Sequence, residues 1–85
     1  MFVIEDELHA EQIGQFSNRA EAIAELRRLA DRPWNEPPNL APCQSWESCG
    51  RRYELIEYDP SSTPWREIGR VSALNVSRAE SVWLL

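Results

Sequence analysis

One stripe of apolar side chains that ends at a proline constrains the fold of this chain more than any other feature. Within residues 18–32 apolar side chains recur at helical spacing and share one face of a helix: Ala22, Ile23, Leu26, Leu29 and Ala30. Asn18 stands three residues before Glu21, a pairing typical of a helix start. Pro33 ends the pattern, because the residue before a proline is pushed out of the α region. We predict one helix over residues 18–32.

The segments on either side of this helix have the shorter patterns of β-strands. Met1–Glu5 and Glu11–Phe16 contain β-favouring apolar residues, and the polar residues between them suit a tight turn. Arg52–Asp59 and Trp65–Val76 are separated by a stretch of proline, serine and threonine, which is a strong turn signal. Each pair of segments therefore predicts an antiparallel hairpin.

The order of these elements predicts an α+β fold in a single domain over residues 1–85. Two antiparallel β-hairpins form a sheet, and the one main helix packs on it in the order β-β-α-β-β, which needs no parallel crossover. Gly14 and Gly69 indicate bulges within their strands. The end of the chain stays open: Ser77–Glu80 has the pattern of a capping box and favours a short helix, whereas Val82–Leu85 could equally be a closing strand.

Residues 33–50 follow neither the helical nor the strand period and form a long connection with four prolines. Connections of this length inside a small domain are usually functional or disordered. Trp34, Leu40 and Trp46 argue against disorder, because disordered segments lack aromatic anchors. We expect an ordered, packed loop.

The charge pattern argues against nucleic-acid and membrane partners. The net charge is −5, and the nine basic residues are all arginines that mostly alternate with acidic residues along the chain, whereas DNA binding requires clustered positive charge. No apolar run approaches the roughly 20 residues that span a bilayer. The N-terminus turns acidic after Ile4, unlike a secretory signal peptide. We expect no nucleic acid and no membrane as partners, and a cytoplasmic location.

Cys43 and Cys49 are separated by five residues, which is not the two-residue spacing of zinc and redox motifs. Three interpretations compete: reduced thiols that act as small apolar groups, a disulfide, and thiolate ligands of a metal. A structural zinc site needs four ligands, and only His9 is an obvious third. The sequence therefore predicts no cofactor, with zinc as the alternative.

No catalytic set is evident in the sequence. Glu5, Glu7, His9 and Glu11 would share one face of a continuous strand and offer oxygen ligands to a divalent cation, but the predicted hairpin turn breaks that register. Nucleophilic catalysis needs a base beside the nucleophile, so a small enzyme would require His9 to lie near a cysteine. We predict no catalytic residues.

Four residues in and beside the long loop are of the types that dominate protein interfaces: Trp34, Trp46, Arg51 and Arg52. The alternative for the two loop tryptophans is that they hold the loop against the sheet. Trp65 and Trp83 lie in or beside predicted strands, where core positions are expected.

By elimination, the sequence predicts a non-catalytic protein-interaction or regulatory module that acts through residues 33–52. The alternative is a metal- or redox-responsive domain that uses Cys43 and Cys49. A second copy of the chain is a further candidate partner, because a sheet edge or the apolar end Val82–Leu85 could pair with its equivalent.

The end of the loop and the strand after it contain five short motifs: Ala41-Pro42-Cys43, Ser45-Trp46, Cys49-Gly50-Arg51, Tyr53-Glu54 and Ile56-Glu57-Tyr58-Asp59. Together these motifs carry a resemblance to a family of short uncharacterised bacterial proteins. It covers residues 33–59 closely and the rest loosely. It implies no activity, but it implies that the loop belongs to the domain and is not a linker.

Overall fold

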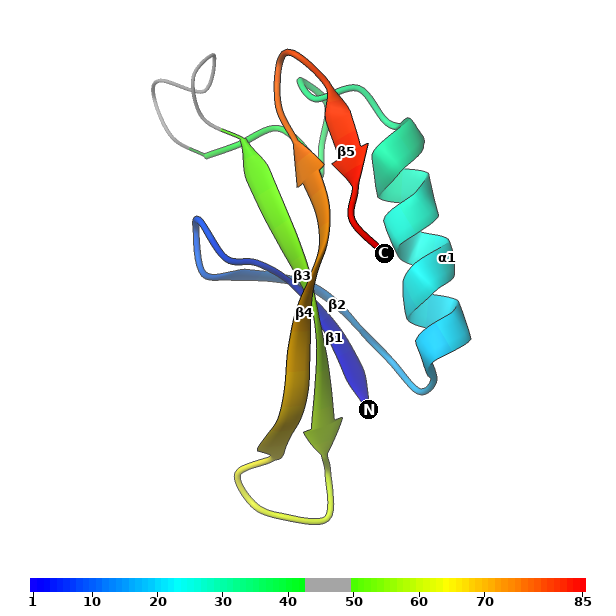
Figure 1. Cartoon of the computed structure of the whole chain (residues 1–85). Helices are drawn as coiled ribbons and strands as arrows, with labels where there is room; N and C mark the ends of the chain where they lie inside the picture. Colours follow the sequence, from blue (N-terminus) through cyan, green and yellow to red (C-terminus); the bar gives the residue numbers. More distant parts are fainter. Residues whose placement is uncertain (43–49) are drawn as a thin grey trace.

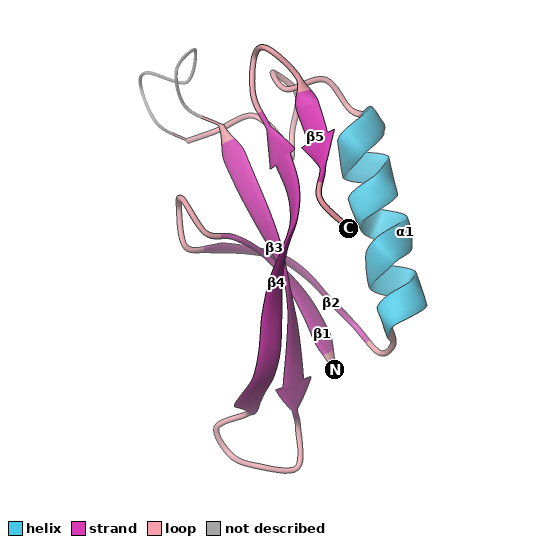
Figure 2. Cartoon of the chain, viewed as in Figure 1, coloured by secondary structure: helices cyan, strands magenta, loops and turns pink. Residues whose placement is uncertain are grey.

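The computed structural model describes residues 1–42 and 50–85, and within them one antiparallel sheet of five strands carries one helix on one face (Figures 1 and 2). The elements in chain order are β1 (Phe2–Asp6), β2 (Glu11–Phe16), α1 (Arg19–Asp31), β3 (Arg51–Asp59), β4 (Arg66–Val76) and β5 (Ser81–Trp83). The strands lie in the order β2-β1-β3-β4-β5. The α+β class is therefore confirmed.

The predicted relation between the two hairpins is corrected by the pairing of β1 with β3. Both hairpins form, but β1 lies between β2 and β3, with Val3 opposite Ile56 and Ile4 opposite Leu55. These four side chains are at most 3% exposed, on either side of the sheet. The two most apolar strand segments thus occupy the centre of one sheet, because only a central strand can bury both its faces.

The C-terminal segment forms the fifth strand, so the short helix favoured at this end is wrong. Ser77 and Glu80 instead close a turn: the Ser77 N–H donates to the Glu80 carbonyl at 2.9 Å, and the Glu80 N–H donates to Ser77 Oγ at 3.3 Å. The same serine that could cap a helix therefore closes the connection from β4 to β5. Trp83, opposite Leu74, packs against the buried core, as predicted.

Helix α1 begins and ends within one residue of the prediction. The Asn18 side chain accepts the Glu21 N–H at 2.9 Å, as in a helix cap. Ala22, Leu26 and Leu29 have no exposed surface and pack on one face of the sheet. Burial of one leucine side chain contributes about 1.5–3 kcal/mol, so this stripe holds the helix in place.

Bulges adjoin both predicted glycines, and the second one lies where a two-stranded arm of β3 and β4 begins. The β1–β2 register shifts beside Gly14, and the β3–β4 register shifts beside Gly69. Beyond the second shift β3 and β4 run on as a two-stranded arm away from α1 (Figure 1). Trp65, predicted as core, is 38% exposed on this arm and lies 6.2 Å from the Tyr58 ring.

The first part of the long loop is anchored by Asn39, which is 1% exposed. Its Nδ2 donates to the carbonyls of Leu29 at 2.8 Å and Arg32 at 3.1 Å, at the end of the helix, where the last carbonyls lack the usual helical N–H partners. Its Oδ1 accepts the Tyr53 hydroxyl of β3 at 2.8 Å. The loop is thus tied to both the helix end and the sheet.

Candidate functional site

Asp6, at the end of β1, is the centre of a buried ionic cluster. Its Oδ2 accepts Arg51 Nη1 at 2.9 Å and is in contact with His9 Nδ1, while its Oδ1 accepts the Arg52 N–H at 3.0 Å. Arg51 Nη1 also donates to Glu11 Oε2 at 3.1 Å, and Nη2 donates to the Leu40 carbonyl at 2.8 Å. The cluster joins both ends of the β1–β2 turn to the start of β3.

The hydrogen bonds of this cluster set the charge of its members. Burial acts to raise the pKa of Asp6, but the hydrogen bonds from Arg51, the Arg52 N–H and His9 outweigh it, and the net pKa lies below the ordinary 3.8. Burial raises the pKa of Tyr53 above its ordinary 10.0, so its hydroxyl stays protonated and donates to Asn39. Asp6 and Arg51 are therefore a charged pair at neutral pH.

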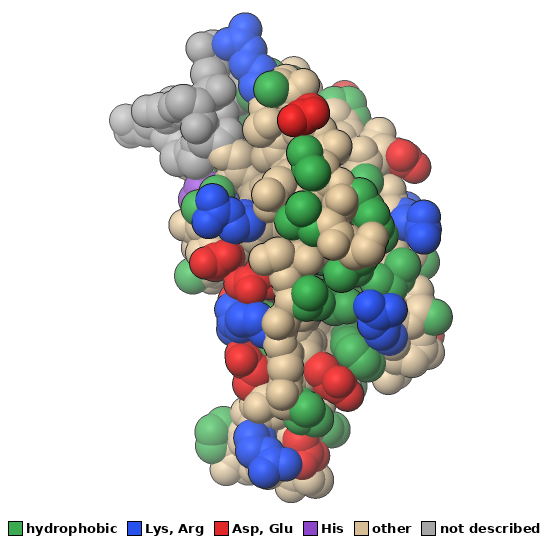
Figure 3. Space-filling model, viewed as in Figure 1, with side chains coloured by type: hydrophobic (Ala, Val, Ile, Leu, Met, Phe, Trp, Pro, Cys, Tyr) green, Lys and Arg blue, Asp and Glu red, His purple; other side chains and the backbone are tan. Residues whose placement is uncertain are grey.

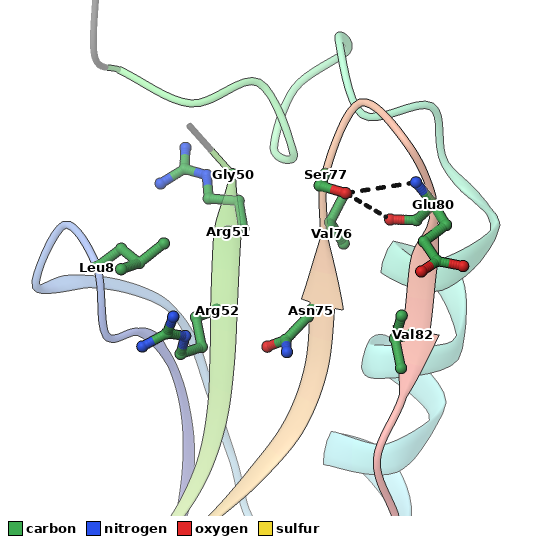
Figure 4. A pocket seen from close by; sticks show the side chains of 9 residues that line it. All are labelled: Leu8, Gly50, Arg51, Arg52, Asn75, Val76, Ser77, Glu80 and Val82. Atoms are coloured by element: carbon green, nitrogen blue, oxygen red, sulfur yellow. Dashed lines mark hydrogen bonds between the residues drawn. The ribbon is translucent and has the colours of Figure 1, made fainter. Parts of the chain in front are cut away.

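A pocket of about 320 Å³ opens beside this cluster, between the β1–β2 turn and β5 (Figure 4). Arg52 of β3 pairs with Asn75 of β4, and Asn75 pairs with Val82 of β5. Directly paired residues share one face, so these side chains stand in a row. Leu8 extends the row on the side of the turn, and α1 lies behind the strands (Figure 4).

Within the pocket, the Arg52 guanidinium and Asn75 Oδ1 are available to bind a ligand. The Arg52 guanidinium is exposed and forms no ion pair with any part of the chain that the structure describes. Asn75 Oδ1 is buried and accepts no hydrogen bond within residues 1–42 and 50–85. The pocket thus offers an unpaired cation beside an unused acceptor.

Apolar side chains stand at both ends of the pocket. Leu8 is 48% exposed at one end, and Val82 is 36% exposed at the other. Glu80 lies at the β5 end as well, so this end also carries a negative charge.

Gly50 is needed at the start of β3, because a Cβ there would lie 2.3 Å from the Val76 carbonyl oxygen. The close approach of these two strands shapes one wall.

Arg70, another arginine on the sheet, has its charge balanced by nearby carboxylates, which distinguishes it from Arg52. Arg70 of β4 donates to Glu54 at 2.9 Å and Glu67 at 2.8 Å, and Glu5 lies 3.6 Å away. The hydrogen bonds to Glu67 and Glu54, against a smaller effect of burial, raise the pKa of Arg70 further above its ordinary value. Figure 3 shows basic and acidic side chains interleaved over the face in view.

The structure separates the sequence-predicted site residues into groups with different surroundings. Arg52 lines the pocket, whereas Arg51 is 5% exposed and held in the ionic cluster. Trp34 is half-buried and packs against the core. His9 contacts Asp6. Trp46, Cys43 and Cys49 lie outside the described residues.

Sequence reasoning did not identify Asp6, Asn75 or Leu8 as neighbours of a site, and it considered Val82 only as part of an apolar end that could pair with a second copy. Asp6 gave a weak signal, since a carboxylate follows an apolar strand directly. Asn75 gave a similar one, as an amide between Leu74 and Val76. Neither signal indicates which strand lies opposite, and the pocket depends on that pairing.

Neither a gathered set of metal ligands nor a membrane-spanning helix is present in the described part of the chain. No group of three or more metal-ligating side chains is gathered within residues 1–42 and 50–85. In the same residues the one helix is too short and too polar to cross a membrane. Comparison with protein-family models, curated proteins and solved structures found no match to this chain.

Proposed function

We propose that this protein is a non-catalytic protein-interaction module that binds its partner on the sheet face opposite α1. The observation that carries the proposal is the pocket in which the guanidinium of Arg52, without an ion pair among the described residues, lies between exposed Leu8 and Val82. Arginine is one of the residue types enriched at interface hot spots. Arg52 also belongs to the segment 33–52, the site expected from the sequence.

The surroundings of Arg52 support a binding role over a structural one. Several exposed arginines of this chain lie within reach of an acidic side chain, as Arg28 does with Glu25 Oε2, 2.9 Å from its Nε. Arg52 has no such neighbour among the described residues, although the chain carries a net charge of −5. An acidic partner surface would supply the missing charge.

A double variant, Arg52→Glu with Val82→Asp, tests the proposal. Both side chains are exposed, so the fold is expected to persist, and the melting temperature checks this. Used as bait in lysate of the source cells, the wild type is expected to retain a partner that the variant loses. Arg28→Glu on α1, which changes the charge by two units against three in the double variant, is the control and is expected to retain it. Identical captured sets for wild type and double variant would refute the proposal.

A second copy of the chain is an alternative partner for the exposed C-terminal residues. Leu84 is 45% and Leu85 39% exposed, next to the edge strand β5. An edge strand presents backbone groups that another strand can pair with. Light scattering across a hundredfold range of concentration tests this alternative. A constant monomer mass would exclude it over that range.

A metal- or redox-responsive site that uses Cys43 and Cys49 is the second candidate function, and His9 supports it. A buried carboxylate contacts His9 Nδ1, as is usual for histidines that bind a metal through the other ring nitrogen. Native mass spectrometry with and without chelator and reductant tests this candidate. A mass that corresponds to the bare, reduced chain in every condition would exclude it.

A further inference from the structure

The row of side chains across the pocket has a regular spacing set by the strands that carry it. Arg52, Asn75 and Val82 lie on adjacent strands, which are about 4.8 Å apart. Glu7 lies one step beyond Arg52, since its N–H donates to the Arg52 carbonyl at 2.9 Å, and the next residue, Leu8, lines the pocket on that side. The two apolar ends of the row are therefore separated by three steps, or about 14 Å.

This spacing matches that of side chains on one face of an extended peptide. In an extended chain each residue advances by about 3.4 Å, and alternate side chains point to the same side. The first, third and fifth side chains then lie at about 0, 7 and 13 Å along the peptide. The outer two would contact Leu8 and Val82, and the central one would lie between Arg52 and Asn75.

The polar groups of the pocket specify what the central residue must carry. The guanidinium of Arg52, which no carboxylate within residues 1–42 and 50–85 pairs with, calls for a carboxylate, to which arginine donates paired hydrogen bonds. The buried Asn75 Oδ1 calls for an N–H donor, and a peptide backbone supplies one beside every side chain. Glu80 at the β5 end would repel a second carboxylate there, so the acidic residue is confined to the centre.

We propose that the pocket recognises an extended partner segment of the pattern apolar-x-acidic-x-apolar. The central carboxylate binds Arg52, a backbone N–H beside it donates to Asn75 Oδ1, and the outer side chains pack on Leu8 and Val82. A pocket of about 320 Å³ accommodates the central side chain and part of its neighbours. This inference rests on the proposed function and names the chemistry of the partner.

The test uses two synthetic peptides that differ only in the central charge, acetyl-Val-Thr-Asp-Thr-Leu-amide and the same peptide with asparagine in place of aspartate. Each is titrated into isotopically labelled protein and followed by NMR at low ionic strength. We expect the aspartate peptide to bind about tenfold more tightly, as for one charge-assisted hydrogen bond. The shifted signals should be the backbone amides of Arg52, Asn75 and Val82 and the side-chain amide of Asn75.

Two variants locate the origin of this preference. Arg52→Gln is expected to bind the two peptides equally, because the charge that distinguishes them is gone. Arg28→Gln, on the opposite face, is expected to keep the tenfold preference. The preference is a ratio within one protein sample, so a general change in stability does not affect it.

Three outcomes would overturn the inference: equal binding of the two peptides by the wild type, a preference that survives in Arg52→Gln, or no shift with either peptide at millimolar concentration. If one of these occurs while the double variant Arg52→Glu with Val82→Asp still loses its captured partner, the proposed function stands and only the peptide pattern is wrong. If the double variant keeps its partners, the proposed function itself is wrong.

Discussion

At the scale of single residues, Asp6 contributes most to the order of the structure around the pocket. It has no exposed surface and accepts four hydrogen bonds, from the Leu8 and Arg52 backbone, from His9 and from Arg51. A buried charge is tolerated only when it is paired and hydrogen-bonded. Asp6 therefore fixes the turn that carries Leu8 and the strand that carries Arg52.

Replacement of this carboxylate by an amide should be strongly destabilising. Asp6→Asn keeps the shape but leaves the Arg51 guanidinium with the half-exposed Glu11 as its one counter-charge among the described residues, and we expect a loss of about 3–5 kcal/mol in the free energy of unfolding. Urea denaturation measures the loss. The exposed Asp31→Asn is the control, with an expected change within about 0.5 kcal/mol. A loss below about 1 kcal/mol for Asp6→Asn would contradict this account.

The lowered pKa of Asp6 also predicts how stability depends on pH. Because the pKa in the folded protein lies below the ordinary 3.8, the unfolded chain binds this proton more tightly than the folded one. The stabilisation from Asp6 is thus complete well above pH 3.8 and is lost as the pH falls through the lower folded value. Urea midpoints measured from pH 6 to about pH 2 should fall more steeply for the wild type than for Asp6→Asn. Parallel curves would exclude the ion pair as the cause.

At the scale of elements, close packing of neighbouring strands decides which positions accept a side chain. The two glycines at the ends of the β3–β4 hairpin look alike in the sequence but have different surroundings. A Cβ on Gly50 would lie 2.3 Å from the Val76 carbonyl oxygen, whereas a Cβ on Gly69 would meet nothing within 4 Å. The first glycine permits the approach of β3 to β4, and the second only adjoins the bulge.

An alanine at each glycine therefore forms a matched pair of variants. Gly50→Ala should lower the free energy of unfolding by about 1–3 kcal/mol, because the strands must separate to admit the methyl group. Gly69→Ala should be neutral or stabilising by up to about 1 kcal/mol, since it restricts only the unfolded chain. Thermal denaturation of both variants is the measurement. Equal effects would show that contact with Val76 does not constrain position 50.

At the scale of the whole molecule, two parts are held together differently. One is the β3–β4 arm, and the other is the body, which consists of α1 and the part of the sheet that α1 covers (Figure 1). The surface area of 5208 Å² agrees with the roughly 5,200 Å² expected for a folded chain of this mass. The extents of 40 × 24 × 18 Å are nevertheless unequal, since the β3–β4 arm runs beyond the part of the sheet that α1 covers (Figure 1). Stability should therefore depend on the body much more than on the arm.

Truncation of one large side chain in each part tests this difference. Leu26→Ala removes a side chain with no exposed surface from the helix–sheet core and should cost about 2–5 kcal/mol. Trp65→Ala removes the larger but 38% exposed ring of the arm and should cost about 1 kcal/mol, the value of its contact with Tyr58. Urea denaturation of the two variants gives both values. A larger loss for Trp65→Ala would show that the arm supports the body.

The sequence by itself determined the features that depend on local spacing. The helix, its Asn18 cap, its end before Pro33 and the two hairpins all follow from residues close together in the chain, because period, capping and turn chemistry act over a few residues. The sequence also showed where a bulge or a turn was expected. It did not decide between a helix and a strand for Ser81–Trp83, which takes its form from pairing with β4.

Only the tertiary structure decided which of Arg51 and Arg52 is buried in the ionic cluster and which lines the pocket. The two arginines are adjacent and chemically identical, but consecutive side chains of a strand point to opposite faces. Which face is covered depends on the placement of α1, and which residue meets Asp6 depends on the pairing of β1 with β3. Arg51 therefore became part of the buried cluster, while Arg52 was left unpaired among the described residues, beside Asn75 in the pocket. These contacts join residues more than 20 positions apart, and local patterns carry no information about them.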